Sequence, residues 1–373
     1  MAQVRYGVLG CGMMGQEHLR NLALIEGAQV VAIFEPDAAM RDACKQLEPN
    51  ADFVDSVEAL CARPDLDALL VASPNHCHAE QLLTLLSHTK LPILIEKPLV
   101  TRIEDVEAVR VAAAAYPAPV WVAMEYRYMP PVTRLREHVQ AGDTGPVSML
   151  SIREHRFPFL SKVGDWNRFN ANTGGTLVEK CCHFFDLMRL LLDSEATSVM
   201  ASAGQDVNHR DEAYNGQTPD ILDNAYVIVN FANGRRAMLE LCMFAEGSRY
   251  QEEISVVGQT AKVDCLVPGP GRFWPEHLGE PPTPKVVLSQ REPKGPVESD
   301  IPVDPALLAA GDHNGSTFYQ HMGFFKAITE GAPVEVSVDD GLKAVVLGLA
   351  AQASALDGKA MRITRGGFGF EPA

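Results

Sequence analysis

Short apolar runs alternate with amphipathic stretches through the first part of the chain. The runs predict strands, and apolar residues between them recur every three or four positions, as they do in helices that cover a sheet. This alternation is typical of βαβ units and a parallel sheet. The predicted strands are Val4–Leu9, Val30–Phe34, Ala68–Ala72, Ile93–Glu96 and Val120–Met124. The predicted helices are His18–Ile25, Met40–Leu47, Val57–Cys61, Ala79–Ser87 and Val106–Ala115. We therefore expect residues 1–126 to form a doubly wound α/β domain of the Rossmann type.

A different pattern begins after Tyr128. Strands are predicted with few helices between them, at Val147–His155, Val199–Ala203, Ala225–Phe231, Arg236–Met243 and Glu253–Val257. The strongest helical patterns are Thr176–Leu192, Ser316–Glu330 and Val338–Leu356. This grouping predicts that residues 127–373 form an α+β domain with a mostly antiparallel sheet, open on one face. We expect that face to join copies of the chain in a homodimer or homotetramer. The Pro- and Gly-rich residues 268–305 predict a long surface excursion.

Composition narrows the function classes. A chain of 373 residues with 46% hydrophobic and 21% charged residues fits two well-packed domains. The net charge of −16 disfavours binding to nucleic acid or to an anionic membrane surface. We expect a cytoplasmic protein, because no apolar run reaches the length of a membrane span, no secretory signal pattern opens the sequence, and its eight cysteines form no CxxC pair.

A glycine-rich turn follows the first predicted strand. Gly10, Gly12 and Gly15 fit G-x-G-x-x-G and open a predicted helix, which is the context of a dinucleotide-binding turn. The glycines allow a tight turn, a close approach of the pyrophosphate and close packing of helix on strand, while the helix N-terminus faces the negative charge. A turn that binds nothing is the weaker alternative.

Two later strand ends extend this predicted cofactor site. Glu35 ends the second strand, where a carboxylate accepts hydrogen bonds from the adenosine ribose and repels a 2′-phosphate, so NAD is favoured over NADP. Ser73 and Asn75 follow the third strand, at the sheet edge where ligands bind. The neighbouring His76, Cys77 and His78 lack the spacing of a zinc site, and we expect no metal.

Two segments carry candidate chemistry. Glu96-Lys97-Pro98 ends an apolar strand at the same sheet edge, so a partly desolvated Lys97 could donate to a substrate oxygen, with the proline in a cis peptide. Glu179, His183 and Asp186 recur at i, i+4 and i+7 on the predicted helix 176–192 and would share one face. His183 suits a general base near neutral pH, and Glu179 could orient it or hold a substrate hydroxyl. The alternatives are a salt-bridged strand end and a solvated helix face.

These motifs, in this order, resemble the Gfo/Idh/MocA oxidoreductase family over nearly the whole chain. Ser73-Pro74-Asn75-His76-Cys77-His78 and Asp340-Gly341-Leu342 also match family motifs. The resemblance implies an NAD-dependent dehydrogenase of sugars or cyclitols such as inositol, with Lys97 as the catalytic lysine and His183 as the proton-transferring histidine. Glu179 stands where the family usually has Asp, and Cys181 where it often has Gly.

The predicted site residues follow from the motifs and the resemblance together. The predicted cofactor contacts are Gly10, Gly12, Met13, Met14, Gly15, Glu35, Ser73, Asn75, His78, Glu96 and Lys97. The predicted substrate contacts are Lys97, Tyr126, Arg127, Arg153, His155, Trp166, Arg168, Glu179 and His183, of which Lys97, Glu179 and His183 are the catalytic candidates.

Two other functions stay open: reduction of another carbonyl substrate, including with a recycled cofactor, and non-catalytic NAD sensing.

Overall fold

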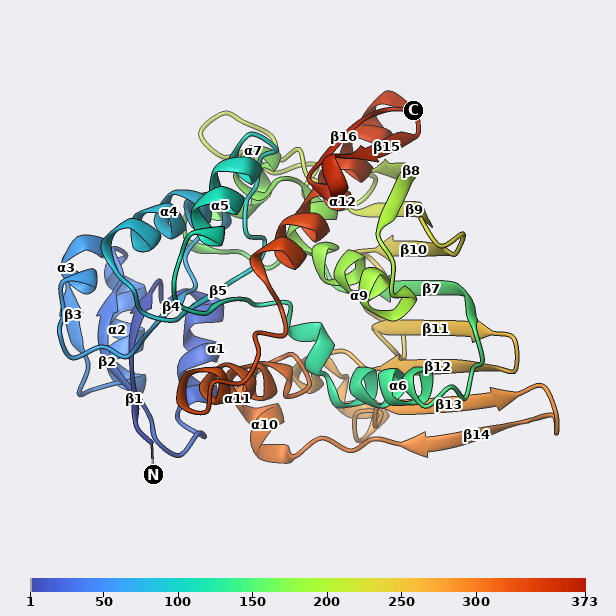
Figure 1. Cartoon of the computed structure of the whole chain (residues 1–373), viewed down its shortest axis with the longest axis horizontal. Coiled ribbons are helices and arrows are strands. Elements are labelled where there is room, and N and C mark those ends of the chain that lie inside the picture. Colours follow the sequence, from blue (N-terminus) through green and yellow to red (C-terminus); the bar gives the residue numbers. More distant parts are fainter. Residues whose placement is uncertain (1) are drawn as a thin grey trace.

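A computed structural model describes residues 2–373 and places two sheets side by side (Figure 1). Within these residues the first sheet has six strands in the order β3-β2-β1-β4-β5-β6, all parallel. Its strands are β1 (Val4–Leu9), β2 (Ala28–Phe34), β3 (Asp52–Val54), β4 (Ala68–Val71), β5 (Ile93–Ile95) and β6 (Val120–Val122). Its helices are α1 (Met13–Leu22), α2 (Ala38–Leu47), α3 (Val57–Cys61), α4 (His78–His88) and α5 (Asp105–Ala114). The predicted doubly wound domain is confirmed.

The apolar runs explain this sheet. Every residue of β4, β5 and β6 is buried, as expected for parallel strands covered on both faces. The sequence prediction missed β3, because none of the three residues of this strand, Asp52–Val54, is fully buried and they form no apolar run. The carboxyl ends of β1, β2, β4 and β5 meet at one edge, so the segments that follow these strands are gathered there.

The second sheet is mixed and mostly antiparallel, as predicted. Within the described residues it has ten strands in the order β14-β13-β12-β11-β7-β10-β9-β8-β15-β16, with β7 and β10 parallel. The strands are β7 (Val147–His155), β8 (Ala196–Gly204), β9 (Asn224–Phe231), β10 (Arg236–Cys242), β11 (Glu252–Gly258), β12 (Ala261–Val267), β13 (Lys285–Gln290), β14 (Gly295–Asp300), β15 (Met361–Thr364) and β16 (Gly369–Pro372).

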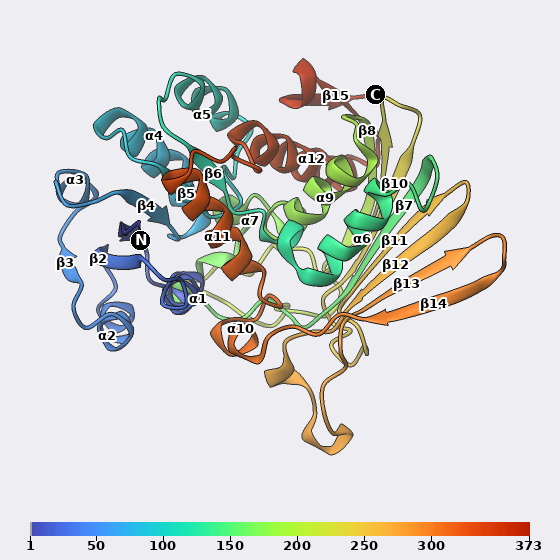
Figure 2. The ribbon, with the colours of Figure 1, turned by 60° about the horizontal axis from the view of Figure 1, so that its bottom comes forward.

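Helices cover one face of this sheet and leave the other open (Figure 2). The covering helices include α6 (Pro130–Gln140), α9 (Cys182–Leu192) and α12 (Val338–Asp357). Buried and exposed residues alternate along β9, which is the pattern of a sheet with one solvated face. Large apolar side chains are nevertheless exposed on the strands, namely Met149, Met200, Tyr226, Ile228 and Met238.

Two sequence predictions need correction here. The predicted excursion 268–305 contains a hairpin, because β13 and β14 pair and extend the sheet, and only residues 268–284 and 301–304 flank it outside strands. The predicted helix 176–192 is interrupted at Lys180 and Cys181, which separate α8 (Thr176–Glu179) from α9. The predictions also missed β15 and β16, two four-residue strands close to the end of the chain.

The late part of the chain returns to the first domain. After α10 (Pro305–Ala310), helix α11 (Ser316–Thr329) packs against α1 and against the turn η2 (Glu125–Tyr128). The ring of Phe324 on α11 lies 6.4 Å from that of Tyr6 and 6.3 Å from that of Trp121. Residues from both ends of the sequence therefore share one core beside the first sheet. Among the described helices, none is long and apolar enough to cross a membrane.

Candidate active site

A cavity of about 530 Å³ lies at the carboxyl edge of the first sheet. The glycine-rich turn, the end of β2, the segment after β4 and the end of β5 form its walls. Among the predicted cofactor contacts, the cavity is lined by Gly10, Gly12, Met13, Met14, Glu35, Ser73, Asn75, His78, Glu96 and Lys97. The structure thus brings together residues that lie up to 87 positions apart in the sequence.

The glycines of the turn differ in what surrounds them. Gly10 has φ +89°, and a Cβ there would lie 2.7 Å from the backbone of Ser73. A Cβ on Gly15 would lie 2.3 Å from the carbonyl oxygen of Gly10. A Cβ on Gly12 would meet nothing within 4 Å, and Gly12 is the N-cap of α1 without a side-chain cap. The space above Gly12 and the free N–H groups of α1 therefore fit a pyrophosphate.

The carboxylate of Glu35 is fixed just after β2, where the sequence predicts a contact with the adenosine ribose. Its carboxylate accepts hydrogen bonds from the backbone N–H groups of Cys11, at 2.6 Å, and Asp37, at 2.8 Å. Arg41 donates to the carbonyl oxygen of Glu35, so its guanidinium is engaged by the backbone. The Nδ2 atom of Asn75 is buried without a partner among the described residues and faces the same cavity. A carboxylate and an unpaired amide fit the adenosine half of NAD.

Residues of the second domain close the cavity from the other side. Trp166 and Lys162 both line it, and the ammonium of Lys162 lies 4.5 Å from the indole centroid. Trp166, predicted to contact the substrate, therefore lies beside the predicted cofactor site, with His76 5.9 Å from its ring. The ring nitrogens of His78 lie 2.8 Å from the carbonyl oxygen of Pro98 and 2.9 Å from that of Ser73, so His78 joins two walls.

Lys97 reaches from the first domain to the second. Its Nζ donates to the carbonyl oxygen of Glu179 at 3.1 Å, and the peptide bond to Pro98 is cis. Burial alone would lower the pKa of Lys97, but neighbouring acidic groups, Cys182 and Glu96 foremost, raise it above its usual value. The side chain is therefore an ammonium group at the inner end of the cavity.

Glu96 anchors the base of this lysine. Its carboxylate lies 2.9 Å from Nε2 of His18 and accepts a 3.2 Å hydrogen bond from the backbone N–H of Lys97. The other ring nitrogen of His18 is 2.9 Å from Nε2 of His321. Burial would raise the pKa of Glu96, yet the hydrogen bond and charge of His18 lower it. Glu96 thus presents a carboxylate beneath Lys97.

His183 lies one turn beyond Glu179 and is 2% exposed. Its ring stacks on that of Tyr126, with centroids 4.2 Å apart and planes 8° apart. Its Nδ1 has no hydrogen-bond partner among residues 2–373. Burial, followed by the charges of Lys97 and Lys180, holds the pKa of His183 well below its usual value. The imidazole is therefore neutral near pH 7 and able to accept a proton.

Glu179 lies between the two candidate catalytic groups. Its Oε1 accepts a 3.1 Å hydrogen bond from Lys162, while its Oε2 is buried without a partner in the described part of the chain. Because the helix breaks after this residue, its carbonyl oxygen is available to Lys97. Glu179 can hold a substrate hydroxyl through Oε2 and hold Lys97 through its backbone.

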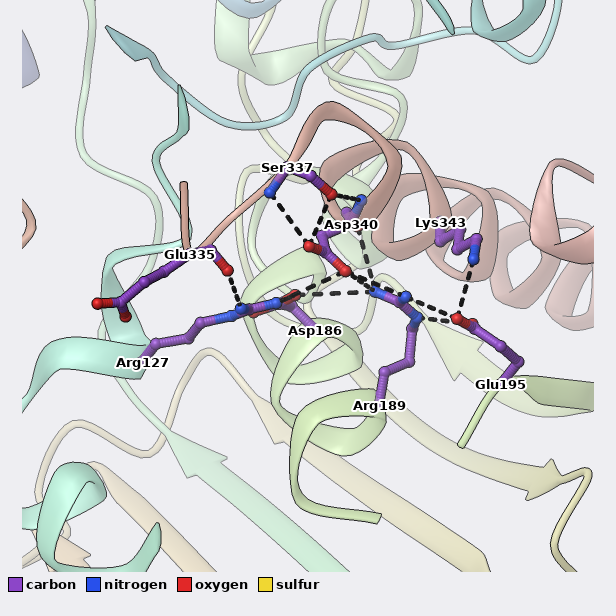
Figure 3. A network of polar contacts seen from close by, with 8 residues as sticks. All are labelled: Arg127, Asp186, Arg189, Glu195, Glu335, Ser337, Asp340 and Lys343. Atoms are coloured by element: carbon purple, nitrogen blue, oxygen red, sulfur yellow. Dashed lines mark hydrogen bonds and ion pairs between the residues drawn. The ribbon is translucent and has the colours of Figure 1, made fainter. Parts of the chain in front are cut away.

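Arg127 and Asp186 belong to a different network (Figure 3). The guanidinium of Arg127 makes two 2.5 Å hydrogen bonds to the carboxylate of Asp186 and donates to the carbonyl oxygen of Glu335. Arg189 bonds Asp340 at the start of α12 in the same network. A buried carboxylate needs such a bidentate partner. The structure therefore pairs Arg127 with Asp186 and does not place it among the substrate contacts, while Asp186 lies three residues after His183 on α9.

Three more predicted substrate contacts are engaged elsewhere. Arg153 pairs with Glu253 on the neighbouring strand, and His155 lies 3.1 Å from Glu240, both on the open side of β7. Arg168 is buried and bonded to Glu212 at 3.2 Å. Cross-strand partners satisfy the first two, so the structure does not bring them to Lys97 and His183. Tyr126 is at the site, stacked beneath His183.

The sequence analysis missed a cluster contributed by α1, η2 and the start of α11. His313 Nδ1 lies 2.7 Å from Glu17 Oε1, and its Nε2 lies 3.7 Å from Glu125 Oε1. The hydroxyl of Thr317 bonds both carboxylates. These three acidic and imidazole groups are close enough to bind a metal ion. Because both nitrogens of His313 face carboxylates, the contacts describe an imidazolium held between two domains.

Replacement of Glu17 tests the ion pairs that His313 makes with Glu17 and Glu125. Glu125 and Glu17 raise the pKa of His313 to about 9 against the lowering by burial, and His313 lowers that of Glu17 to about 2 against the raising by burial. The contribution of His313 is present below pH 6.5 and lost as the pH rises through about 9. That of Glu17 is present above pH 4.5 and lost as the pH falls through about 2.

Glu17→Gln is therefore expected to lower the free energy of unfolding most between pH 4.5 and 6.5. The loss there should be about 3 kcal/mol, as for a broken buried ion pair, and smaller above about pH 9. Urea denaturation of both proteins across this range measures it. An equal loss at every pH would show that the carboxylate acts without the imidazolium.

Gly12→Ala and Gly15→Ala form a matched pair for the cofactor turn. A Cβ at position 12 projects into the open space, so we expect the Kd for NAD to rise at least about tenfold with an unchanged melting temperature. A Cβ at position 15 strikes the Gly10 carbonyl, so this variant should also melt earlier. Fluorescence titration and thermal unfolding separate the two, and unaltered NAD affinity in Gly12→Ala would contradict the assignment.

Comparison with known protein families agrees with this geometry. The profile described as the oxidoreductase family, NAD-binding Rossmann fold, matches residues 4–124. The profile described as the oxidoreductase family, C-terminal alpha/beta domain, matches residues 136–363. The second match alone spans more than half of the chain.

Individual relatives are distant. The rhizopine catabolism protein MocA of Rhizobium meliloti is 28% identical over 210 residues, which are 55% of this chain and 62% of that protein. The myo-inositol 2-dehydrogenase of Thermotoga maritima is 25% identical over 363 residues, covering 96% of this chain and 98% of the relative. A solved complex of levoglucosan dehydrogenase with NADH and levoglucosan shares the fold, with a TM-score of 0.79, 20% identity and coverage of 97% and 100%. The two profile matches show that the chain belongs to the Gfo/Idh/MocA family of NAD-binding oxidoreductases.

Proposed function

We propose that the protein oxidises a hydroxyl-bearing carbon of a sugar, a sugar derivative or a cyclitol, with NAD as the hydride acceptor, and that the reaction is reversible. The observation that carries this proposal is the hydrogen bond from Lys97, which lines the cofactor cavity, to the carbonyl oxygen of Glu179, one helical turn before His183. The ammonium thus lies near enough to the imidazole for its charge to lower the pKa of His183. Oxidation of an alcohol needs a base for the hydroxyl proton and a positive charge for the developing alkoxide.

The two residues divide these tasks. Bound NAD supplies an electrophilic nicotinamide carbon that accepts the hydride. His183 takes the proton of the substrate hydroxyl, because its imidazole is neutral and its Nδ1 is unpaired among the described residues. Lys97 remains protonated and stabilises the negative charge that grows on the same oxygen. Its bond to the Glu179 carbonyl keeps the ammonium in place.

The substrate class follows from the unpaired groups and from the relatives. Glu179 Oε2 is a buried acceptor without a partner in the described chain, and a second substrate hydroxyl would satisfy it. The names of the relatives include a cyclitol dehydrogenase, and the structural neighbour contains an anhydrosugar. A polyhydroxylated ring therefore fits better than a simple carbonyl compound. A protein that only senses NAD would need neither Lys97 nor His183.

We also propose that copies of the chain associate through the open face of the second sheet, in a homodimer or homotetramer. Exposed apolar side chains such as Tyr226, at 60%, and Ile228, at 49%, lie together on β9. Burial of this face would remove apolar area from water. A cytoplasmic location fits the cysteines, all of which are free in the described structure.

Catalysis is tested with single variants on a panel of cyclitols, aldoses, deoxy sugars and sugar acids, by the absorbance of NADH. We expect Lys97→Met and His183→Gln each to lower kcat by about 10² to 10⁴. His183→Gln should leave the Kd for NAD unchanged, because His183 does not line the cofactor cavity. Lys90→Met, at an exposed lysine, is the control. Full activity in either site variant would refute the assigned roles.

Association is tested by analytical ultracentrifugation. The wild-type protein should sediment as a multiple of the chain, and Ile228→Glu should shift it toward the monomer because a carboxylate would be buried in the interface. Leu356→Glu, at a residue that is 81% exposed on α12, should leave the assembly unchanged. A monomeric wild-type protein would rule the interface out.

A further inference from the structure

A cluster of buried charges surrounds the hydroxyl of Tyr126, the residue on which His183 stacks. Lys180 is 5% exposed, and its Nζ lies 2.8 Å from Glu154 Oε1 and donates to the hydroxyl of Tyr126. The Tyr126 hydroxyl in turn donates to Glu252 Oε1 at 3.2 Å. Glu154 is fully buried and Glu252 is 2% exposed. A single ammonium therefore connects a carboxylate and a phenol in the protein interior.

The two carboxylates are an unusual pair for a sheet. Glu154 on β7 and Glu252 on β11 are direct partners across the antiparallel ladder. Like charges at such positions destabilise a sheet, and burial adds a desolvation cost. Lys180 and, at 3.7 Å from Glu154, Arg156 supply the compensating charges. Such an arrangement lowers the stability of the folded protein, and a role of these charges in the adjacent active site would account for their presence.

Tyr126 connects the cluster to the base. Its ring is the surface on which the His183 ring lies, 4.2 Å away and almost parallel. Its hydroxyl accepts from Lys180 and donates to Glu252, so both of its hydrogen-bonding directions are in use. These bonds hold the hydroxyl end of the phenol, the Lys180 ammonium lies 4.6 Å from the centroid of its ring, and the imidazole stacks on that ring.

His183 also lies within reach of the charge of the cluster. The positive groups that act on it are Lys97 after β5, Arg156 after β7, Lys180 at the break between α8 and α9, and His313 before α11. The acidic groups nearby are Glu179, one turn before it, Glu154 beside Lys180, Glu252 beside Tyr126 and Glu125 beside His313. After burial and Lys97, Lys180 is the next cause of the lowered pKa of His183. Burial and the charge of Glu154 raise the pKa of Glu252 to about 7.

We propose that Lys180 is a positioning residue for the reaction: it holds Tyr126, the ring on which His183 stacks, and its charge, paired with Glu154, keeps that imidazole unprotonated near neutral pH. This inference deepens the proposed function and rests on His183 being the base. Lys180 does not reach the substrate or the cofactor cavity, because its ammonium is directed to Glu154 and Tyr126.

The test is a titration of His183 by NMR in the full-length protein with bound NAD, using ¹³C-labelled histidine. The spectrum of His183→Gln identifies the His183 signal among the 11 histidines. This readout needs no substrate, so it stays informative if the screen for the proposed activity fails. Near-ultraviolet circular dichroism of each variant confirms that its fold is intact.

In the wild-type protein the His183 signal should keep its neutral position well below the pH at which a free imidazole titrates. Lys180→Met removes a nearby positive charge, so the pKa of His183 should rise by on the order of one pH unit or more. Lys180→Arg keeps the charge and should leave most of the wild-type behaviour. Lys180→Gln replaces Lys180→Met if the latter does not fold.

Addition of Glu154→Gln to Lys180→Met is the decisive step. It removes the carboxylate that Lys180 faces at 2.8 Å, so the pKa of His183 should fall back toward the wild-type value. A purely structural lysine would not be rescued in this way. An unchanged His183 titration in folded Lys180→Met or Lys180→Gln would overturn the proposal, and so would a shift that Glu154→Gln does not reverse.

Discussion

One hydrogen bond between the two domains sets the geometry of the candidate site: the ammonium of Lys97 to the carbonyl oxygen of Glu179. The acceptor is available because α8 ends at Glu179, and the last carbonyls of a helix have no partner within it. The helix resumes at Cys182, which places His183 in the first turn of α9 and near the same ammonium. A continuous helix would use this carbonyl for its own backbone bond. The interruption at Lys180 and Cys181 therefore leaves the Glu179 carbonyl free to position Lys97, and it places His183 in a separate helix.

Buried polar and charged groups are the second feature on which the site depends. Some of these groups are fully paired, and others lack a partner. Arg127 and Asp186 pair through two hydrogen bonds, and the network around them connects η2, α9 and α12, as Figure 3 shows. Around Lys97 and His183, by contrast, polar atoms of Glu179, His183 and Asn75 lack partners in residues 2–373. Unpaired buried groups cost folding free energy, and a bound cofactor and substrate would satisfy them. Stability is thus concentrated in the supporting network and binding capacity in the site.

The sequence could predict whatever depends on a strand end or a short motif. Gly12, Glu35 and Lys97 each follow a recognisable strand, and parallel strands bring their carboxyl ends to one edge, so their meeting was foreseeable. The roles of Arg127 and Arg153 could not be foreseen, because the sequence does not show which carboxylate each arginine binds. The structure pairs Arg127 with Asp186 and Arg153 with Glu253. His313 and Lys180 gave no local signal, since the groups that define them, from Glu17 to Glu252, are assembled only by folding. The hairpin β13–β14 was obscured by the Pro and Gly residues around it.

The most direct test of the central claim is a crystal structure of the protein with NADH. We expect the adenosine ribose to contact Glu35 and the pyrophosphate to lie above Gly12. The nicotinamide ring should lie beside Lys97, with its reactive carbon facing the space between that ammonium and His183. A hydroxylated ligand captured there should contact both residues. A nicotinamide that pointed away from Lys97, or an ordered complex in which His183 was walled off from the ring, would contradict the assignment of this pair as the reaction centre.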